Sequence, residues 1–102
     1  MYRARDRVEQ EEWLTEIERA SDSLDLPSEA RSVAEDLFLS NAPEEERSKR
    51  AVAAASLYAG ALIAGDERSQ SAVANAMSVA RLSVQQRWKP IMEDAGFETP
   101  SW

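Results

Sequence analysis

The chain has 102 residues, a net charge of −7, and neither cysteine nor histidine. This length predicts one domain, and the missing cysteine excludes a disulfide framework, a thiolate metal site and a thiol nucleophile. Without histidine the commonest general base and a common metal ligand are also absent. Asp66 and Glu67 are adjacent acids without a convergent partner, so we expect a protein that is not an enzyme and uses no cofactor or metal. No apolar run at the N-terminus resembles a signal peptide, which favours a cytoplasmic protein without a membrane partner.

The charges are unevenly placed along the chain. Residues 1–46 carry −9, residues 47–92 carry +5, and residues 93–102 carry −3. No acidic residue occurs between positions 68 and 92. Such asymmetry suggests a side that faces a polyanion or a partner of complementary charge. The alternative is that these charges only solvate helix faces.

Two amphipathic helices are predicted in the acidic N-terminal half. The first spans about residues 6–23, where apolar residues recur at helical spacing and acids occupy the opposite face. Its apolar stripe consists of Val8, Trp13, Leu14, Ile17, Ala20 and Leu24, which places Trp13 in the core. Pro27 ends this helix, and the second helix begins at Pro27 or Ser28 and runs to Asn41.

A helix over about residues 47–65 is predicted to be the centre of the domain. Between residues 51 and 64 only Ser56 and Gly60 are not apolar, and neither is charged. A helix that is apolar on every side is expected to be surrounded by other helices. The apolar stretch is shorter than the roughly 20 residues that a membrane span needs. Gly65 is the residue type expected at the end of such a helix.

A short helix over about residues 69–77 and a final helix from Ser83 complete the prediction. Ser83 and Gln86 form an S-x-x-Q capping box, which places the start of the final helix at Ser83. Pro90 lacks a backbone donor and is expected to kink or end this helix near residues 86–89. The predicted buried stripe consists of Val84, Trp88, Ile91 and Ala95.

A short helix, a tight turn and a capped helix with basic and amide side chains form the layout of a helix-turn-helix. Arginine and lysine contact DNA phosphates, and glutamine can contact adenine in the major groove. The alternative is that Gln86 only caps its helix and that Arg87 and Lys89 only solvate it. A second basic cluster, for which contact with DNA backbone or an acidic partner and simple solvation both stay open, consists of Arg47, Lys49 and Arg50.

The central helix contains the run Arg47-Ser48-x-x-Ala51-Val52-x-Ala54-Ala55-Ser56-Leu57-Tyr58-Ala59. This run resembles the third helix of a cyclin-like repeat of the transcription factor IIB family. The resemblance is closest to the archaeal form, transcription factor B. It extends over about residues 10–97 and favours the second of the family's two repeats. The resemblance implies an all-α, five-helix cyclin-like bundle over residues 1–97, followed by a short flexible tail over residues 98–102.

In that family, two repeats sit against the TATA-binding protein on promoter DNA, and the second repeat reads DNA through its helix-turn-helix. The resemblance places the base-reading positions at Leu82 and Gln85, where the family usually has valine and arginine. Ser78 replaces a usual glycine, and Trp88 replaces a tyrosine. Because glutamine cannot reproduce the bidentate contact of arginine to guanine, an altered or lost sequence preference is expected. The candidate nucleic-acid-binding residues are Arg68, Ser69, Arg81, Leu82, Gln85, Gln86 and Lys89.

The family's zinc ribbon needs cysteines, and this chain resembles only one repeat. Two roles fit it: a stand-alone regulator that binds promoter DNA, the TATA-binding protein complex or both through its helix-turn-helix, or a cyclin-like protein-interaction module that has lost DNA binding. An acidic chain with only two lysines has the composition of proteins from salt-loving archaea. In molar salt the Debye length falls to about 3 Å, which screens repulsion from DNA, but phosphate contacts also weaken. We therefore expect binding to DNA jointly with another protein, which is the TATA-binding protein or another transcription protein.

Overall fold

The computed structural model describes residues 10–99. Within this range helices are the only regular secondary structure, as predicted. Five helices follow one another, with the bounds α2 (Glu11–Ser23), α3 (Ser28–Asn41), α4 (Glu46–Ile63), α5 (Gln70–Met77) and α6 (Arg81–Asp94). The expected start of the first helix near residue 6, Val8 of its stripe and most of the expected tail, including Trp102, lie outside the described residues. Within residues 10–99, no helix is both long and apolar enough to cross a bilayer.

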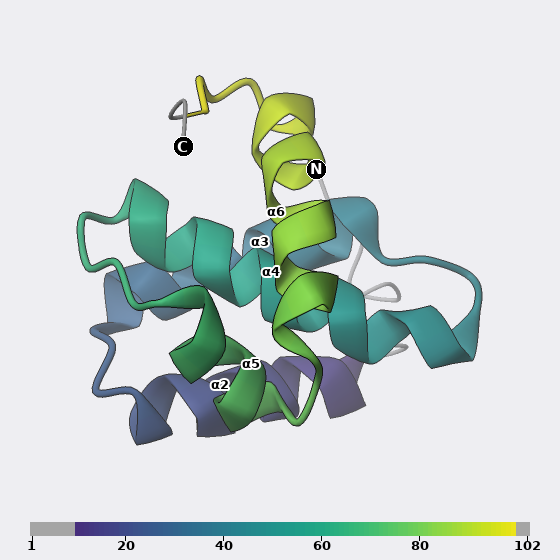
Figure 1. Cartoon of the computed structure of the whole chain (residues 1–102), viewed down its shortest axis with the longest axis horizontal. Helices are drawn as coiled ribbons and strands as arrows, with labels where there is room; N and C mark the ends of the chain where they lie inside the picture. The colour runs from purple at the N-terminus through teal and green to yellow at the C-terminus, as the bar shows by residue number, and fades with distance from the viewer. Residues whose placement is uncertain (1–9, 100–102) are drawn as a thin grey trace.

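Helix α4 forms the centre of the bundle, as its composition predicts. Every residue from 53 to 61 is buried, so α4 has no exposed side over more than two turns. The other four helices all pack against it. Figure 1 shows α6 crossing in front of α4, α3 behind it, and α2 and α5 beside each other along one edge. This arrangement removes an entire helix surface from water, which is the main stabilising contribution expected in a domain of this size.

The backbones of α3 and α4 approach each other closely at Gly60. A β-carbon placed on Gly60 would lie 2.7 Å from the backbone nitrogen of Ala34 and 2.8 Å from its α-carbon. Real side chains do not tolerate such distances. Glycine at position 60 and alanine at position 34 therefore allow the two helix backbones to touch, and this contact fixes the separation of α3 and α4.

Helix α4 ends as predicted, at a glycine with a left-handed backbone. Gly65 has a φ of +81°. Its N–H donates to the carbonyl of Leu62 at 3.2 Å, and the N–H of Asp66 donates to the carbonyl of Ala61 at 2.9 Å. This is a Schellman motif, which satisfies carbonyl groups that the helix end leaves unpaired.

Helix α6 starts earlier than the capping box predicts, and this prediction is wrong. The helix begins at Arg81 after an extended Ala80 and has no side-chain cap. The N–H of Ser83 donates to the carbonyl of Ala80 at 3.0 Å, so Ser83 is already inside the first turn. The start is set by the preceding turn, because Ser78 adopts a left-handed conformation with φ of 60° that ends α5 and redirects the chain.

Pro90 does not end α6, which continues to Asp94. Pro90 and Gln86 are both exposed, so the carbonyl that loses its intrahelical partner faces solvent. On the inner side, Val84, Trp88 and Ile91 are buried as predicted, and Met92 is buried with them. Ala95 is exposed and follows the last helical residue, so its predicted place in the buried stripe is wrong. Burial of the side chains on the inner face of α6 stabilises the helix on both sides of Pro90.

The two described tryptophans lie in the core, as predicted. Trp13 is 7% exposed and Trp88 is 1% exposed. The ring of Trp88 meets the ring of Tyr58 edge to face, with centroids 5.2 Å apart and planes at 69°. This contact ties α6 to the central helix.

Candidate nucleic-acid interface

Helices α5 and α6 form a compact unit, here called the α5–α6 unit (residues 69–94). The hydroxyl of Ser69 accepts the N–H of Ala72 at 3.0 Å and caps α5. The turn of residues 78–80 then joins α5 to α6. The N–H of Val79 donates to the carbonyl of Ala74 at 3.0 Å, which closes a second Schellman motif at left-handed Ser78. Ser69 therefore has a structural role as the N-cap of α5.

The N-terminal half of α6 presents polar and apolar side chains to solvent. Arg81, Gln85 and Gln86 are exposed, and Lys89 is half-buried. Leu82 is 53% exposed, which is unusual for a large apolar side chain in this compact domain. Because residues four apart share a helix face, Arg81, Gln85 and Lys89 form one row, and Leu82 and Gln86 form the next. Five of the seven predicted nucleic-acid-binding residues therefore lie in two adjacent rows of α6, although Gln86 lines a different hollow, beside Asn41 and Val52.

Arg81 is tied to two amide side chains. Its Nη1 atom donates to Oε1 of Gln85 at 2.7 Å and to Oε1 of Gln70 at 3.1 Å. These three side chains, with Trp88 and Lys89, line a shallow hollow of about 270 Å³ between α5 and α6. The ammonium nitrogen of Lys89 lies 5.5 Å from the centroid of the Trp88 ring, a cation–π distance. The hollow therefore brings together two cations and two amides, with no carboxylate in its lining.

Arg68 is placed apart from this surface by its own hydrogen bonds. Its Nε donates to the carbonyl of Leu24 at 3.0 Å, and Nη2 donates to the carbonyl of Asp25 at 3.1 Å. Nη1 donates to the carbonyls of Asp66 and Glu67 at 3.0 and 3.3 Å. The guanidinium thus joins the end of α2 to the segment before α5, and it is used within the protein.

The basic cluster at the start of α4 has two different parts. Arg47 is 85% exposed and pairs with Glu45 at 3.2 Å, and Lys49 pairs with Glu46 at 3.5 Å. Arg50 instead contacts the ring of Trp13, with its Cζ 5.1 Å from the ring centroid. Its Nη1 also donates to the carbonyl of Met77 at 3.2 Å. Arg47 and Lys49 therefore form ion pairs with neighbouring acids, whereas Arg50 holds helices together.

Glu16 joins Arg50 to Arg19 in a cluster that the sequence did not reveal. Its Oε1 lies 2.7 Å from Arg19 and 3.4 Å from Arg50. The hydrogen bond from Arg19, together with the charge of Arg50, lowers the pKa of the Glu16 carboxyl below its usual value. Arg19 also donates to the carbonyl of Ala76 at 3.4 Å, so both arginines reach the C-terminal end of α5. Positive charge is favourable there because the carbonyl groups of a helix end are electronegative. The sequence held one hint of this cluster, because Arg19 is one of only two basic residues between positions 10 and 46, where acids are frequent.

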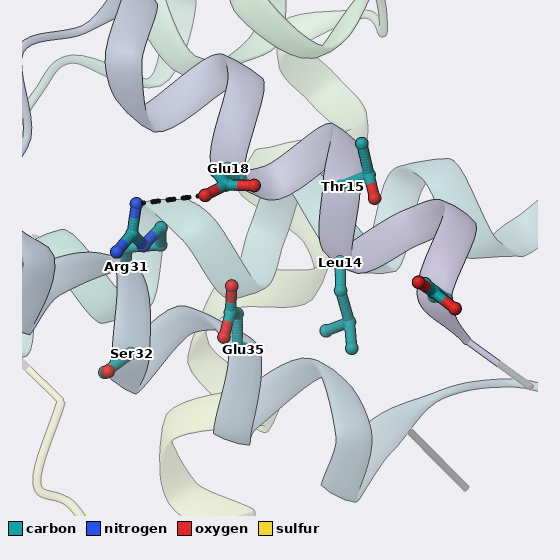
Figure 2. A pocket seen from close by; sticks show the side chains of 7 residues that line it. Leu14, Thr15, Glu18, Arg31, Ser32 and Glu35 are labelled. Atoms are coloured by element: carbon teal, nitrogen blue, oxygen red, sulfur yellow. Dashed lines mark hydrogen bonds and ion pairs between the residues drawn. The ribbon is translucent and has the colours of Figure 1, made fainter. Parts of the chain in front are cut away.

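A larger hollow of about 500 Å³ lies between α2 and α3, and neither α5 nor α6 contributes to its lining. Figure 2 shows Leu14 projecting into the space between the two helices, with Glu35 beside it. Arg31 crosses from α3 to Glu18 on α2 at 3.3 Å. The lining residues are Glu11, Leu14, Thr15, Glu18, Arg31, Ser32 and Glu35. With three carboxylates and one cation, this surface would repel nucleic acid phosphates.

Comparison with known proteins agrees with this architecture. No curated protein matches the chain. The family model described as the transcription factor TFIIB repeat matches residues 7–94, which include the whole of α2 to α6. The matched segment ends with the last residue of α6. The chain therefore belongs to the transcription factor TFIIB repeat family, and its five-helix bundle is a cyclin-like repeat.

Proposed function

We propose that this TFIIB repeat is a non-enzymatic transcription regulator that binds promoter DNA jointly with the TATA-binding protein. The α5–α6 unit acts as a helix-turn-helix, and α6 enters the major groove. The observation that carries the proposal is the solvent-facing surface of α6, where Arg81, Leu82 and Gln85 lie together. No acidic residue occurs between positions 68 and 92, so this surface does not repel phosphates.

The binding face has few cations, which is why the proposal includes a partner protein. Arg81, Arg87 and Lys89 are the basic residues of α6. Even if all three contacted phosphates, the slope of the salt dependence on a double-logarithmic plot would be no steeper than about −3, far below that of a strongly electrostatic DNA-binding protein. The exposed Arg47 at the start of α4 is available for the acidic surface of a partner. The archaeal, salt-loving source and the cytoplasmic location stay predictions.

The proposal is tested by fluorescence anisotropy with a labelled duplex that contains a TATA box and its upstream segment. The protein is titrated at several potassium chloride concentrations, with and without the TATA-binding protein. We expect saturable binding in the presence of the TATA-binding protein and a loss of about one unit of salt slope in Lys89→Ala. Arg31→Ala is the matched control, because it removes one positive charge from the α2–α3 surface and should leave DNA binding unchanged. Absence of binding under every condition would refute the proposal.

A protein-interaction module without DNA binding is the second candidate, and the hollow between α2 and α3 is the observation that favours it. This hollow combines an apolar side chain, Leu14, with three carboxylates. Such a lining suits a partner segment with basic and apolar residues. When the TATA-binding protein or another transcription protein carries the label in place of the duplex, this candidate predicts saturable binding without DNA. It further predicts that Glu18→Lys, and not Lys89→Ala, abolishes the complex.

A further inference from the structure

Arg81 is held in place before any DNA arrives. It is the first residue of α6, and its Nη1 lies between Oε1 of Gln70, the first residue of α5, and Oε1 of Gln85, one turn further along α6. Nη1 carries two hydrogens, and these two bonds use both of them. The long side chain is thereby restricted on a surface where it would otherwise sample many rotamers.

The opposite edge of the guanidinium remains available to a ligand. Among residues 10–99, no hydrogen bond or ion pair of this protein engages Nε or Nη2 of Arg81, and the residue is exposed. The N–H groups on that edge are parallel and match two acceptors in one plane. In the major groove, guanine presents such a pair through O6 and N7. Leu82, at the family's base-reading position, is the next residue of the same helix.

Gln85 is correspondingly unsuited to read a base by itself. Adenine recognition needs the glutamine carbonyl oxygen as acceptor and its amide nitrogen as donor at the same time. In this structure the carbonyl oxygen of Gln85 is already bound to Arg81 at 2.7 Å, the shortest contact of the arginine. A neutral amide would have to give up a charge-assisted hydrogen bond to adopt the reading geometry.

We propose that Arg81 reads a guanine in the major groove and that Gln70 and Gln85 are its positioning residues. The guanidinium that the family usually has at position 85 is thus supplied from position 81, one helical turn earlier. The proposal rests on the proposed function, because it assigns base recognition to the same α5–α6 unit. Pre-organisation is the physical gain, since an arginine that is already ordered loses less conformational freedom on binding.

The test begins with selection from a pool of duplexes that carry a TATA box and a randomised upstream segment, in the presence of the TATA-binding protein. We expect the wild-type protein to enrich guanine at one position and Arg81→Ala to lose that preference. Replacing the selected guanine by 7-deazaguanine removes N7 and should weaken wild-type binding about tenfold, while Arg81→Ala should be insensitive. Arg87→Ala is the matched control, because its guanidinium contacts the carbonyl of Ser83 and it lies outside the hollow that Arg81 lines.

The positioning role has its own readout. Gln85→Leu removes the acceptor for Arg81 and should reduce the enrichment of guanine without changing the melting temperature of the protein. Gln85→Glu restores an acceptor and should restore the preference for guanine, even though its negative charge weakens binding to all duplexes. Gln70→Leu removes the other acceptor for Arg81, on α5, and should reduce the enrichment of guanine in the same way.

Four results would overturn the inference. If Arg81→Ala weakens binding to all duplexes equally and lowers the salt slope by about one, Arg81 contacts a phosphate. If the pool enriches adenine and Gln85→Leu alone removes that enrichment, Gln85 reads the base. If the wild-type protein binds without any preference for guanine, the inference fails while the proposed function stands. Failure to bind any duplex would refute both.

Discussion

Replacement of Gly60 by alanine tests the packing that determines the position of the central helix. The added β-carbon would lie 2.7, 2.8 and 2.9 Å from the N, Cα and Cβ atoms of Ala34. Ordinary contacts between such atoms are about 3.5–4.0 Å, so α3 and α4 would have to separate by several tenths of an ångström. Overpacking of this kind costs about 1–3 kcal/mol, and the upper end applies because two of the three atoms belong to the backbone.

Alanine also favours the helical state over glycine by about 1 kcal/mol, which offsets part of this cost. The expected net loss is therefore about 2 kcal/mol, or a fall of about 8–16 °C in the melting temperature of a domain of this size. The assay is thermal and urea denaturation followed by circular dichroism. The double variant Gly60→Ala/Ala34→Gly should not recover stability, because it removes only the most distant of the three atoms and adds a second helical glycine. A Gly60→Ala protein that melts at or above the wild-type temperature would refute the reasoning.

Three further substitutions test the turns and the arginine contacts, each by urea denaturation. Ser78→Gly should stabilise the protein by about 0.5–1 kcal/mol, since a left-handed serine is strained; an unchanged or lower midpoint would contradict the turn geometry. Arg68→Ala should destabilise by about 1–2 kcal/mol, because four carbonyl groups lose a charged donor, and Arg68→Lys should not rescue it; a midpoint equal to wild type would refute this role. The pKa of Glu16 is lowered from its ordinary value of 4.5, so its contribution to stability is present above that pH and is lost as the pH falls through the lowered pKa. Glu16→Gln should therefore be less stable than wild type at neutral pH, and the difference should disappear as the pH falls through the lowered pKa of Glu16; parallel curves would exclude this linkage.

The central helix could be predicted closely because its composition has one structural solution. Apart from Ser56 and Gly60, no residue between positions 51 and 64 is polar or without a side chain, so every face must be covered. The end at Gly65 was equally readable, since a glycine after an apolar helix supplies the left-handed residue of a Schellman motif. Both inferences depend only on neighbouring residues.

The start of α6 was predicted two residues too late because a stronger constraint overrides the capping pattern. A capping box contributes about 1 kcal/mol, whereas burial of Val84 and Trp88 and the left-handed turn at Ser78 together fix where the helix must lie. The same packing carries the helix through Pro90. Local sequence patterns indicate which helix boundaries a segment favours. Tertiary contacts decide between boundaries that differ little in free energy.

The roles of the arginines were the least predictable part of the candidate site. The charge pattern marked Arg68 and Arg50 as partner-facing, and the structure places both on backbone carbonyl groups. The carbonyl of Leu24 is 44 residues away from Arg68 in the chain. No local pattern can indicate such a pairing, because it exists only after α2, α4 and α5 have packed.

These arginines explain how so short a helix as α5 keeps its place in the bundle. An isolated helix of eight residues is unstable in water, so α5 must be held from outside. Arg68 joins the segment before it to the end of α2, and Arg19 and Arg50 contact the carbonyls at its C-terminal end. Part of the positive charge of residues 47–92 therefore maintains the α5–α6 unit and is not directed at a ligand. The outward surface keeps few cations, so under the proposed function most of the affinity and specificity would come from directed contacts and a partner protein.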